Sequence, residues 1–116
     1  MSQNIQIDLN DYRYQTGYLH FVGCGGVGTG PLMRILHQAG FRVSGSDLRE
    51  NSITRMLKND GMRVEIEHRK ENLPPEDGSK LLLICTSAAA EDNPELLEAE
   101  RRGAVILRRG EALGIM

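Results

Sequence analysis

The sequence has few of the features that mark secreted, metal-binding or nucleic-acid-binding proteins. It contains two cysteines in 116 residues, Cys24 and Cys85, and neither belongs to a CxxC pair. We therefore expect no disulfide framework and no zinc site, but two free thiols in a reducing compartment. The formal net charge is −2. There is thus no excess of basic residues of the kind that binds nucleic acid.

Long apolar segments are also absent. Residues 1–17 are polar and lack a basic stretch followed by an apolar one, so they do not read as a signal peptide. The longest apolar run, residues 81–90, is about half the roughly 20 residues that a membrane-spanning helix needs. We expect a cytoplasmic protein with no membrane segment.

Catalytic signatures are missing as well. No GxxxxGK[ST] loop is present, so no ATP site of that type is expected in this chain. No Ser–His–Asp or Cys–His arrangement is suggested, and no two of the three histidines have metal-ligand spacing. The sequence therefore predicts neither a catalytic residue nor a metal site here.

What the sequence does contain is an alternation of strand-like and helix-like segments. Apolar residues spaced i, i+3, i+4 and i+7 predict the first helix, which Gly40 ends. The second helix begins at Asn51 or Ser52, and the third is capped by Asn93 with Pro94 in its first turn. Strands are expected at 18–22, 41–44, 62–66, 81–85 and 104–107, with one helical turn at most between 67 and 79.

This order predicts an α/β fold, a Rossmann-like, doubly wound, parallel five-stranded sheet of strand order 3-2-1-4-5. Residues 18–116 are expected to form that domain. Residues 1–17 are expected to be an N-terminal arm, either extended along the domain or disordered.

The most informative motif is the glycine cluster between the first strand and the first helix. Gly23 is expected to make the tight turn, and Gly28 to let the helix pack on the sheet. Unpaired N–H groups in the first helical turn attract anions. The motif therefore predicts a diphosphate site formed by Gly25, Gly26, Val27 and Gly28, the alternative being a glycine-rich turn without a ligand.

Other candidate ligand contacts follow the neighbouring strands. Asp47 ends the second strand, where a carboxylate can accept hydrogen bonds from a ribose or a base; the alternative is a loop or capping aspartate. Ser46 and Arg49 flank it, and His68 follows the third strand at the same edge. After the fourth strand, the Ser87 hydroxyl and the small Ala88 leave room for a ring, although a simple turn is an equal alternative.

Several residues receive structural interpretations. His20 is expected to pack within the first strand, and His37 to be solvated on its helix. Cys24 is expected to fill apolar space rather than to react, and residues 98–102 to form a solvated helix face. Arg108 and Arg109 follow the last strand, either near phosphate or at the surface.

Four segments, in this order, resemble the Mur ligase family. They are His-Phe-Val-Gly-Cys-Gly-Gly-Val-Gly at 20–28, Val-Ser-Gly-Ser-Asp at 43–47, Thr-Ser-Ala-Ala-Ala-Glu-Asp-Asn-Pro-Glu-Leu at 86–96 and Arg-Gly-Glu-Ala-Leu at 109–113. They look most like the branch that adds L-alanine to UDP-N-acetylmuramate. The branch that recycles murein tripeptide is less similar in its loop and in the turn after the fourth strand.

The resemblance implies the first domain of a three-domain enzyme of peptidoglycan synthesis. That domain binds the UDP part of UDP-N-acetylmuramate, with residues 25–28 at the diphosphate, Asp47 at the uridine, and Ser87 and Ala88 near the nucleotide. ATP and magnesium are used by the C-terminal ATPase and amino-acid-binding domains, which form an acyl phosphate that alanine attacks. The chain alone would then bind substrate without catalysis and carry no cofactor.

The chain departs from the family pattern in two places. Gly30-Pro31 replaces a serine–glycine pair, and the proline removes one N–H donor from the first helical turn. Cys24 stands where a bulky aliphatic residue is usual. Two other functions fit the glycine loop and Asp47: a stand-alone domain that senses NAD or an adenine nucleotide, and a degenerate domain for protein interaction. The segments at 87–88 and 93–94 favour the Mur ligase interpretation.

Overall fold

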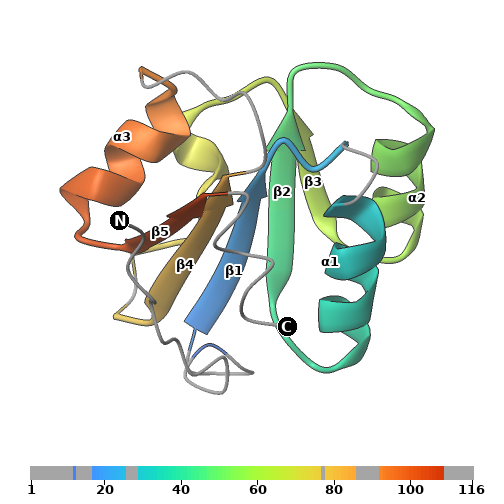
Figure 1. Ribbon diagram of the computed structural model, residues 1–116, viewed down its shortest axis with the longest axis horizontal. Coiled ribbons are helices and arrows are strands. Elements are labelled where there is room, and N and C mark those ends of the chain that lie inside the picture. Colours follow the sequence, from blue (N-terminus) through green and yellow to red (C-terminus); the bar gives the residue numbers. More distant parts are fainter. Residues whose placement is uncertain (1–11, 13–16, 26–28, 77, 86–91, 109–116) are drawn as a thin grey trace, which may run out of the picture.

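The computed structural model describes residues 12, 17–25, 29–76, 78–85 and 92–108, which form a central sheet covered by helices (Figure 1). All strand pairs are parallel, and their order is β3-β2-β1-β4-β5. The predicted doubly wound sheet is therefore confirmed. The elements are β1 (Gly17–Val22), α1 (Thr29–Gln38), β2 (Val43–Asp47), α2 (Ser52–Asn59), β3 (Arg63–Ile66), the 3₁₀ turn η3 (Lys70–Asn72), β4 (Lys80–Cys85), α3 (Pro94–Arg101) and β5 (Val105–Arg108).

The core lies on both faces of the sheet because side chains of a strand alternate between its faces. Leu19 and Phe21 of β1 pack with α1 and α2, whereas Val22 packs in a second cluster with Leu96 of α3. Figure 1 shows α1 and α2 together on one side of the molecule and α3 on the other. The His20 side chain, between Leu19 and Phe21, therefore enters the α3 side of the sheet, where it is fully buried.

Helix starts follow the predicted capping residues. Asn51 caps α2 by accepting a hydrogen bond from the Thr54 N–H, and the Thr54 hydroxyl accepts one from the Asn51 N–H. Asn93 caps α3 by accepting from the Glu95 N–H, and Pro94 is its first residue. Each cap contributes about 1 kcal/mol, so the sequence defines both helix starts locally.

The second strand begins later than predicted, and it continues through Gly45 and Ser46 to Asp47. It spans Val43–Asp47 rather than residues 41–44, because the Phe41 N–H bonds to the Leu36 carbonyl and completes the end of α1. Gly45 interrupts the apolar pattern that predicts a strand, because glycine is uncommon within strands. A Cβ on Gly45 would lie 2.7 Å from Cys24 Cβ and 3.0 Å from Met33 Cε. The residue is small because the loop and α1 pack directly on it.

Most of the expected N-terminal arm lies outside the described residues. Tyr12 is 7% exposed and belongs to the core cluster of β1, α1 and α2. A Cβ on Gly17 would lie 3.0 Å from Tyr12 Cα, so the start of β1 is shaped to this contact. The conformation of the arm as a whole stays a prediction. Among the described helices, none is long and apolar enough to span a bilayer.

Candidate functional site

The loop after β1 is fastened to the carboxyl end of β2. Gly23 has φ of +89°, which a glycine adopts without strain, and makes the predicted tight turn off the strand. The N–H groups of Gly23 and Cys24 both donate to the Ser46 carbonyl, at 2.8 and 2.9 Å. The loop therefore crosses the edge of the sheet where ligands of doubly wound folds bind.

Gly25 lies in a cradle formed by Asp47 and Asn51. Its N–H donates to Asp47 Oδ2 at 2.7 Å, and its carbonyl accepts from Asn51 Nδ2 at 3.2 Å. A Cβ on Gly25 would lie 2.7 Å from Asp47 Oδ2 and 2.8 Å from Asn51 Nδ2. A glycine is therefore needed at position 25 because any side chain would collide with Asp47 and Asn51, whether or not a ligand is bound.

Asp47 supports the loop and keeps capacity to accept further hydrogen bonds. Its Oδ2 accepts from Gly25, and its Oδ1 accepts from the Leu48 N–H at 2.7 Å. An ionised carboxylate offers about four acceptor positions. The structural role that the sequence left as an alternative is therefore present, while the predicted contact with a nucleoside stays a prediction.

The remaining predicted contacts fall into four groups. Arg49 is exposed after β2 and pairs with none of the described carboxylates. Ser46 is fully buried, so its hydroxyl is held inside the protein. His68 is at the predicted edge, and its side chain is 12% exposed. Gly26, Val27, Gly28, Ser87, Ala88 and Arg109 lie outside the described residues.

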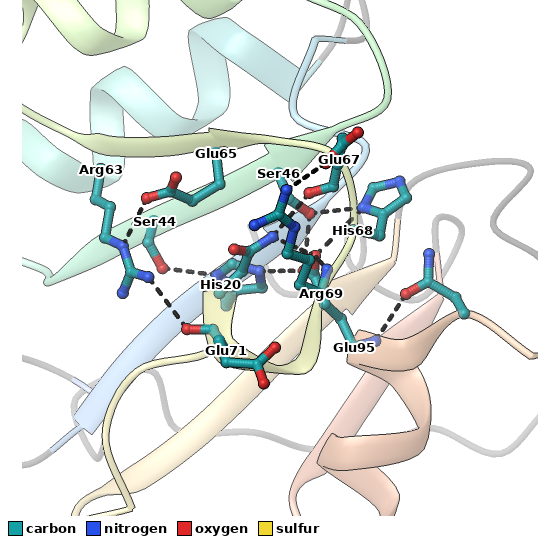
Figure 2. A network of polar contacts seen from close by, with 12 residues as sticks. His20, Ser44, Ser46, Arg63, Glu65, Glu67, His68, Arg69, Glu71 and Glu95 are labelled. Atoms are coloured by element: carbon teal, nitrogen blue, oxygen red, sulfur yellow. Dashed lines mark hydrogen bonds and ion pairs between the residues drawn. The ribbon is translucent and has the colours of Figure 1, made fainter.

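A buried carboxylate network lies behind this edge, and the sequence did not predict it (Figure 2). The Glu95 side chain is 0% exposed. Its Oε1 accepts from His20 Nε2 at 2.6 Å and from the Ser46 hydroxyl at 2.7 Å. Its Oε2 accepts from Asn72 Nδ2 at 2.9 Å and from the Arg69 N–H at 3.1 Å. Glu95 thereby joins α3 to β1, β2 and η3.

The network stabilises the charged form of Glu95. Burial alone would raise the pKa of this carboxyl, but hydrogen bonds from His20, Asn72 and Ser46 and the charge of His20 outweigh it, and the pKa lies below its usual value. The spacing of Glu95 from Ala99 is a sequence signal that could have indicated its burial. Glu95 is four residues before the buried Ala99, so it lies on the face of α3 that packs on the sheet.

Two structural interpretations from the sequence are confirmed. His20 is buried, with its Nδ1 2.7 Å from the Ser44 hydroxyl and its Nε2 bonded to Glu95. Cys24 is fully buried in the core, and burial, together with nearby Asp47, raises the pKa of its thiol to about 12. A thiol with that pKa is a packing group rather than a nucleophile at neutral pH. In the described part of the chain, no three His, Cys, Asp or Glu side chains are arranged to hold a metal ion.

A cavity of about 490 Å³ lies at the other end of the sheet, where the strands begin. It is lined by residues that include Tyr18, Lys80, Arg102 and Val105. Ligands of doubly wound folds bind at the carboxyl ends of the strands, and Gly25, Asp47 and His68 all lie there. We therefore assign the candidate site to the carboxyl edge.

Comparison with known proteins gives consistent matches. A family profile described as "Mur ligase family, catalytic domain" matches residues 18–116. The UDP-N-acetylmuramate–L-alanine ligase of Carboxydothermus hydrogenoformans is 45% identical over 82% of this chain and 20% of its own length. That of Aquifex aeolicus is 44% identical over 81% of this chain and 20% of its own length. The chain thus spans about a fifth of the length of these relatives.

Solved structures agree. The UDP-N-acetylmuramate–alanine ligase of Thermotoga maritima superposes with a TM-score of 0.75 at 30% identity, over 83% of this chain and 21% of that one. The UDP-N-acetylmuramate:L-alanyl-γ-D-glutamyl-meso-diaminopimelate ligase of Neisseria meningitides gives a TM-score of 0.70 at 23% identity, over 83% and 29%. The second match supports the fold alone.

Proposed function

Because the chain belongs to the Mur ligase family, as its motifs predicted, and represents the N-terminal domain of such a ligase, we propose that it binds the UDP moiety of UDP-N-acetylmuramate. In this proposal the whole enzyme adds L-alanine during peptidoglycan synthesis in the cytoplasm. The observation that carries the proposal is the 45% identity to an L-alanine ligase over most of the chain. In this proposal, ATP and magnesium bind to C-terminal domains of the same protein.

The geometry of the carboxyl edge supports nucleotide binding. The loop is held to β2 through Ser46 and Asp47 and to the start of α2 through Asn51, so the first turn of α1 opens at that edge. N–H groups in a first helical turn bind phosphate oxygens through hydrogen bonds and the helix dipole. We assign the diphosphate to residues 25–28, the uridine to Asp47 and His68, and further contacts to Arg49, Ser87 and Ala88.

Substrate binding is then the task of this chain, and ligation is the task of the other domains. The Ser46 hydroxyl lies 2.9 Å from His68 Nδ1, but it is fully buried and donates to Glu95, so the described side chains at the edge offer hydrogen bonds rather than an exposed nucleophile. Holding UDP rigidly would orient the attached muramoyl carboxylate for phosphorylation by ATP and attack by alanine, which is a contribution of position rather than of covalent chemistry.

Calorimetric titration of the 116-residue chain with UDP, UDP-N-acetylmuramate and NAD tests the proposal. We expect both uridine ligands to bind and NAD not to compete. Binding of NAD without binding of UDP would instead favour a nucleotide-sensing domain, and no binding of any nucleotide at millimolar concentration would favour an interaction domain.

Substitution of Asp47 locates the site. Asp47→Ala is expected to weaken UDP binding by about 1–3 kcal/mol, because a charged hydrogen bond is lost. Asp60→Ala is the matched control, since Asp60 pairs with Arg34 at the other end of α2. Unchanged affinity of a folded Asp47→Ala chain would remove Asp47 from the site.

A further inference from the structure

The proton positions in the buried network follow from its acceptors. An ionised carboxylate only accepts hydrogen bonds, so each atom bonded to Glu95 must donate. Ser46 has one hydroxyl proton, and its Oγ lies 2.7 Å from Glu95 Oε1. That proton is therefore directed at Glu95.

This leaves the Ser46 oxygen to accept from His68. His68 Nδ1 lies 2.9 Å from Ser46 Oγ and 3.4 Å from Glu95 Oε2. Because both of these neighbours accept, Nδ1 carries the proton. In a neutral imidazole the other ring nitrogen, Nε2, then has a lone pair and accepts hydrogen bonds.

Nε2 of His68 is turned away from the network. Figure 2 shows Nδ1 facing Ser46 and Glu95, and the far side of the ring pointing outward. The preceding residue, Glu67, has φ of +79°, which a non-glycine residue adopts only at a cost. Hydrogen bonds from the Glu67 N–H to the Asp47 carbonyl, at 2.7 Å, and from Asn72 Nδ2 to the Glu67 carbonyl, at 2.8 Å, hold that turn.

We propose that Glu95 is a positioning residue which, through Ser46, fixes the proton of His68 on Nδ1 and so presents His68 Nε2 as an acceptor for a neutral donor of the bound nucleoside. The donor is the imide N–H of the base or a hydroxyl of the ribose. This inference rests on the proposed binding of UDP. It adds that His68 accepts, rather than donates, a hydrogen bond in its contact with the nucleoside.

The network also explains why a carboxylate is needed rather than an amide. In Glu95→Gln, the amide oxygen remains the acceptor for Asn72 and Arg69, so its NH₂ group faces His20 and Ser46. Ser46 then accepts from the amide and donates to His68 Nδ1. The His68 proton moves to Nε2, and the outward atom changes from an acceptor to a donor.

Imidazole ¹⁵N NMR spectra of the ligand-free chain at about pH 9, where an imidazole is ordinarily neutral, test this step. We expect the Nδ1–H form of His68 in the wild type and the Nε2–H form in Glu95→Gln. His37, which lies on α1, is an internal reference that should not change. Glu98→Gln is the matched variant, because Glu98 lies on the same helix and bonds to Arg101 and Arg102 instead. An Nε2–H form of His68 in the wild type, or the same form in the wild type and in Glu95→Gln, would overturn the proposal.

Binding of UDP tests the consequence. Glu95→Gln and His68→Ala are each expected to bind UDP about tenfold more weakly, the factor for one lost hydrogen bond, and Glu98→Gln to bind as the wild type does. Wild-type affinity of folded Glu95→Gln and His68→Ala chains would contradict the inference while leaving UDP binding intact. A wild-type chain that does not bind UDP would refute the proposed function, whereas the tautomer of His68 would still be measured.

Analogues identify the donor. N3-methyl-UDP removes the imide N–H, and 2′-deoxy-UDP and 3′-deoxy-UDP each remove one hydroxyl. We expect one of the three to bind the wild type about tenfold more weakly than UDP, and to show no further loss in Glu95→Gln. The proposal fails if all three lose affinity in Glu95→Gln as UDP does.

Discussion

Truncation of Glu95 to alanine should destabilise the domain more than any surface substitution. The change removes one acceptor each from His20 Nε2, Ser46 Oγ and Asn72 Nδ2 in a region closed to solvent, although Asn72 still donates to the Glu67 carbonyl. A buried donor without a partner costs roughly 1–3 kcal/mol, and breaking a buried ionic arrangement costs about 3–5 kcal/mol in total. Since small domains are stable by only about 5–15 kcal/mol, Glu95→Ala should lose much of its folding free energy.

Urea unfolding followed by far-ultraviolet circular dichroism measures this loss, because the chain has no tryptophan to report by fluorescence. With a slope of about 2 kcal/mol per molar urea, the midpoint should fall by about 2 M. Glu98→Ala is the control, because Glu98 pairs with the exposed Arg101 and with Arg102 rather than with the buried network. The urea midpoint of Glu98→Ala should fall far less than that of Glu95→Ala. A Glu95→Ala midpoint no lower than that of the control would refute the account of the network.

Three other outcomes follow from the structure. Burial raises the pKa of Glu95, but its hydrogen bonds and the charge of His20 lower it by more, so the folded pKa lies below the unfolded value of 4.5. The stabilisation by ionised Glu95 is therefore complete above pH 4.5 and is lost as the pH falls through the folded pKa, and below pH 4.5 the unfolding free energy should fall less steeply in Glu95→Gln than in the wild type. Cys24 and Cys85 are buried, so a thiol reagent at pH 8 should label neither in the native chain and both in urea; rapid native labelling would contradict the assigned packing. Gly45→Ala places a Cβ 2.7 Å from Cys24 Cβ and should cost about 1–3 kcal/mol in urea unfolding, whereas an unchanged midpoint would show that the loop yields easily.

Much of the fold was predictable because its signals are local. The 3.6-residue period of α1, the caps at Asn51 and Asn93, and the glycine turn at Gly23 each act over a few residues. Together with the right-handed crossover of parallel strands, they define the sheet order. The strand that was misplaced, β2, contains Gly45, whose small size serves packing from elsewhere and weakens the strand pattern.

The candidate site was less predictable because its contacts join distant parts of the chain. His20 and Glu95 are separated by 75 residues and meet only after β4 and α3 are in place. The position of Asp47 predicts a ligand contact, but its bond to the Gly25 N–H depends on how the loop folds back over β2. Residue type and spacing thus predict a site at the carboxyl edge of the sheet. Which polar groups there are already hydrogen-bonded to other parts of the protein depends on three-dimensional packing.

The most direct test of the central claim is a crystal structure of the chain with UDP. We expect the diphosphate against the N–H groups between Gly25 and Thr29, and the uridine beside Asp47 and His68. UDP bound at the opposite end of the sheet, or a carboxyl edge that stays empty at saturating UDP, would contradict the account.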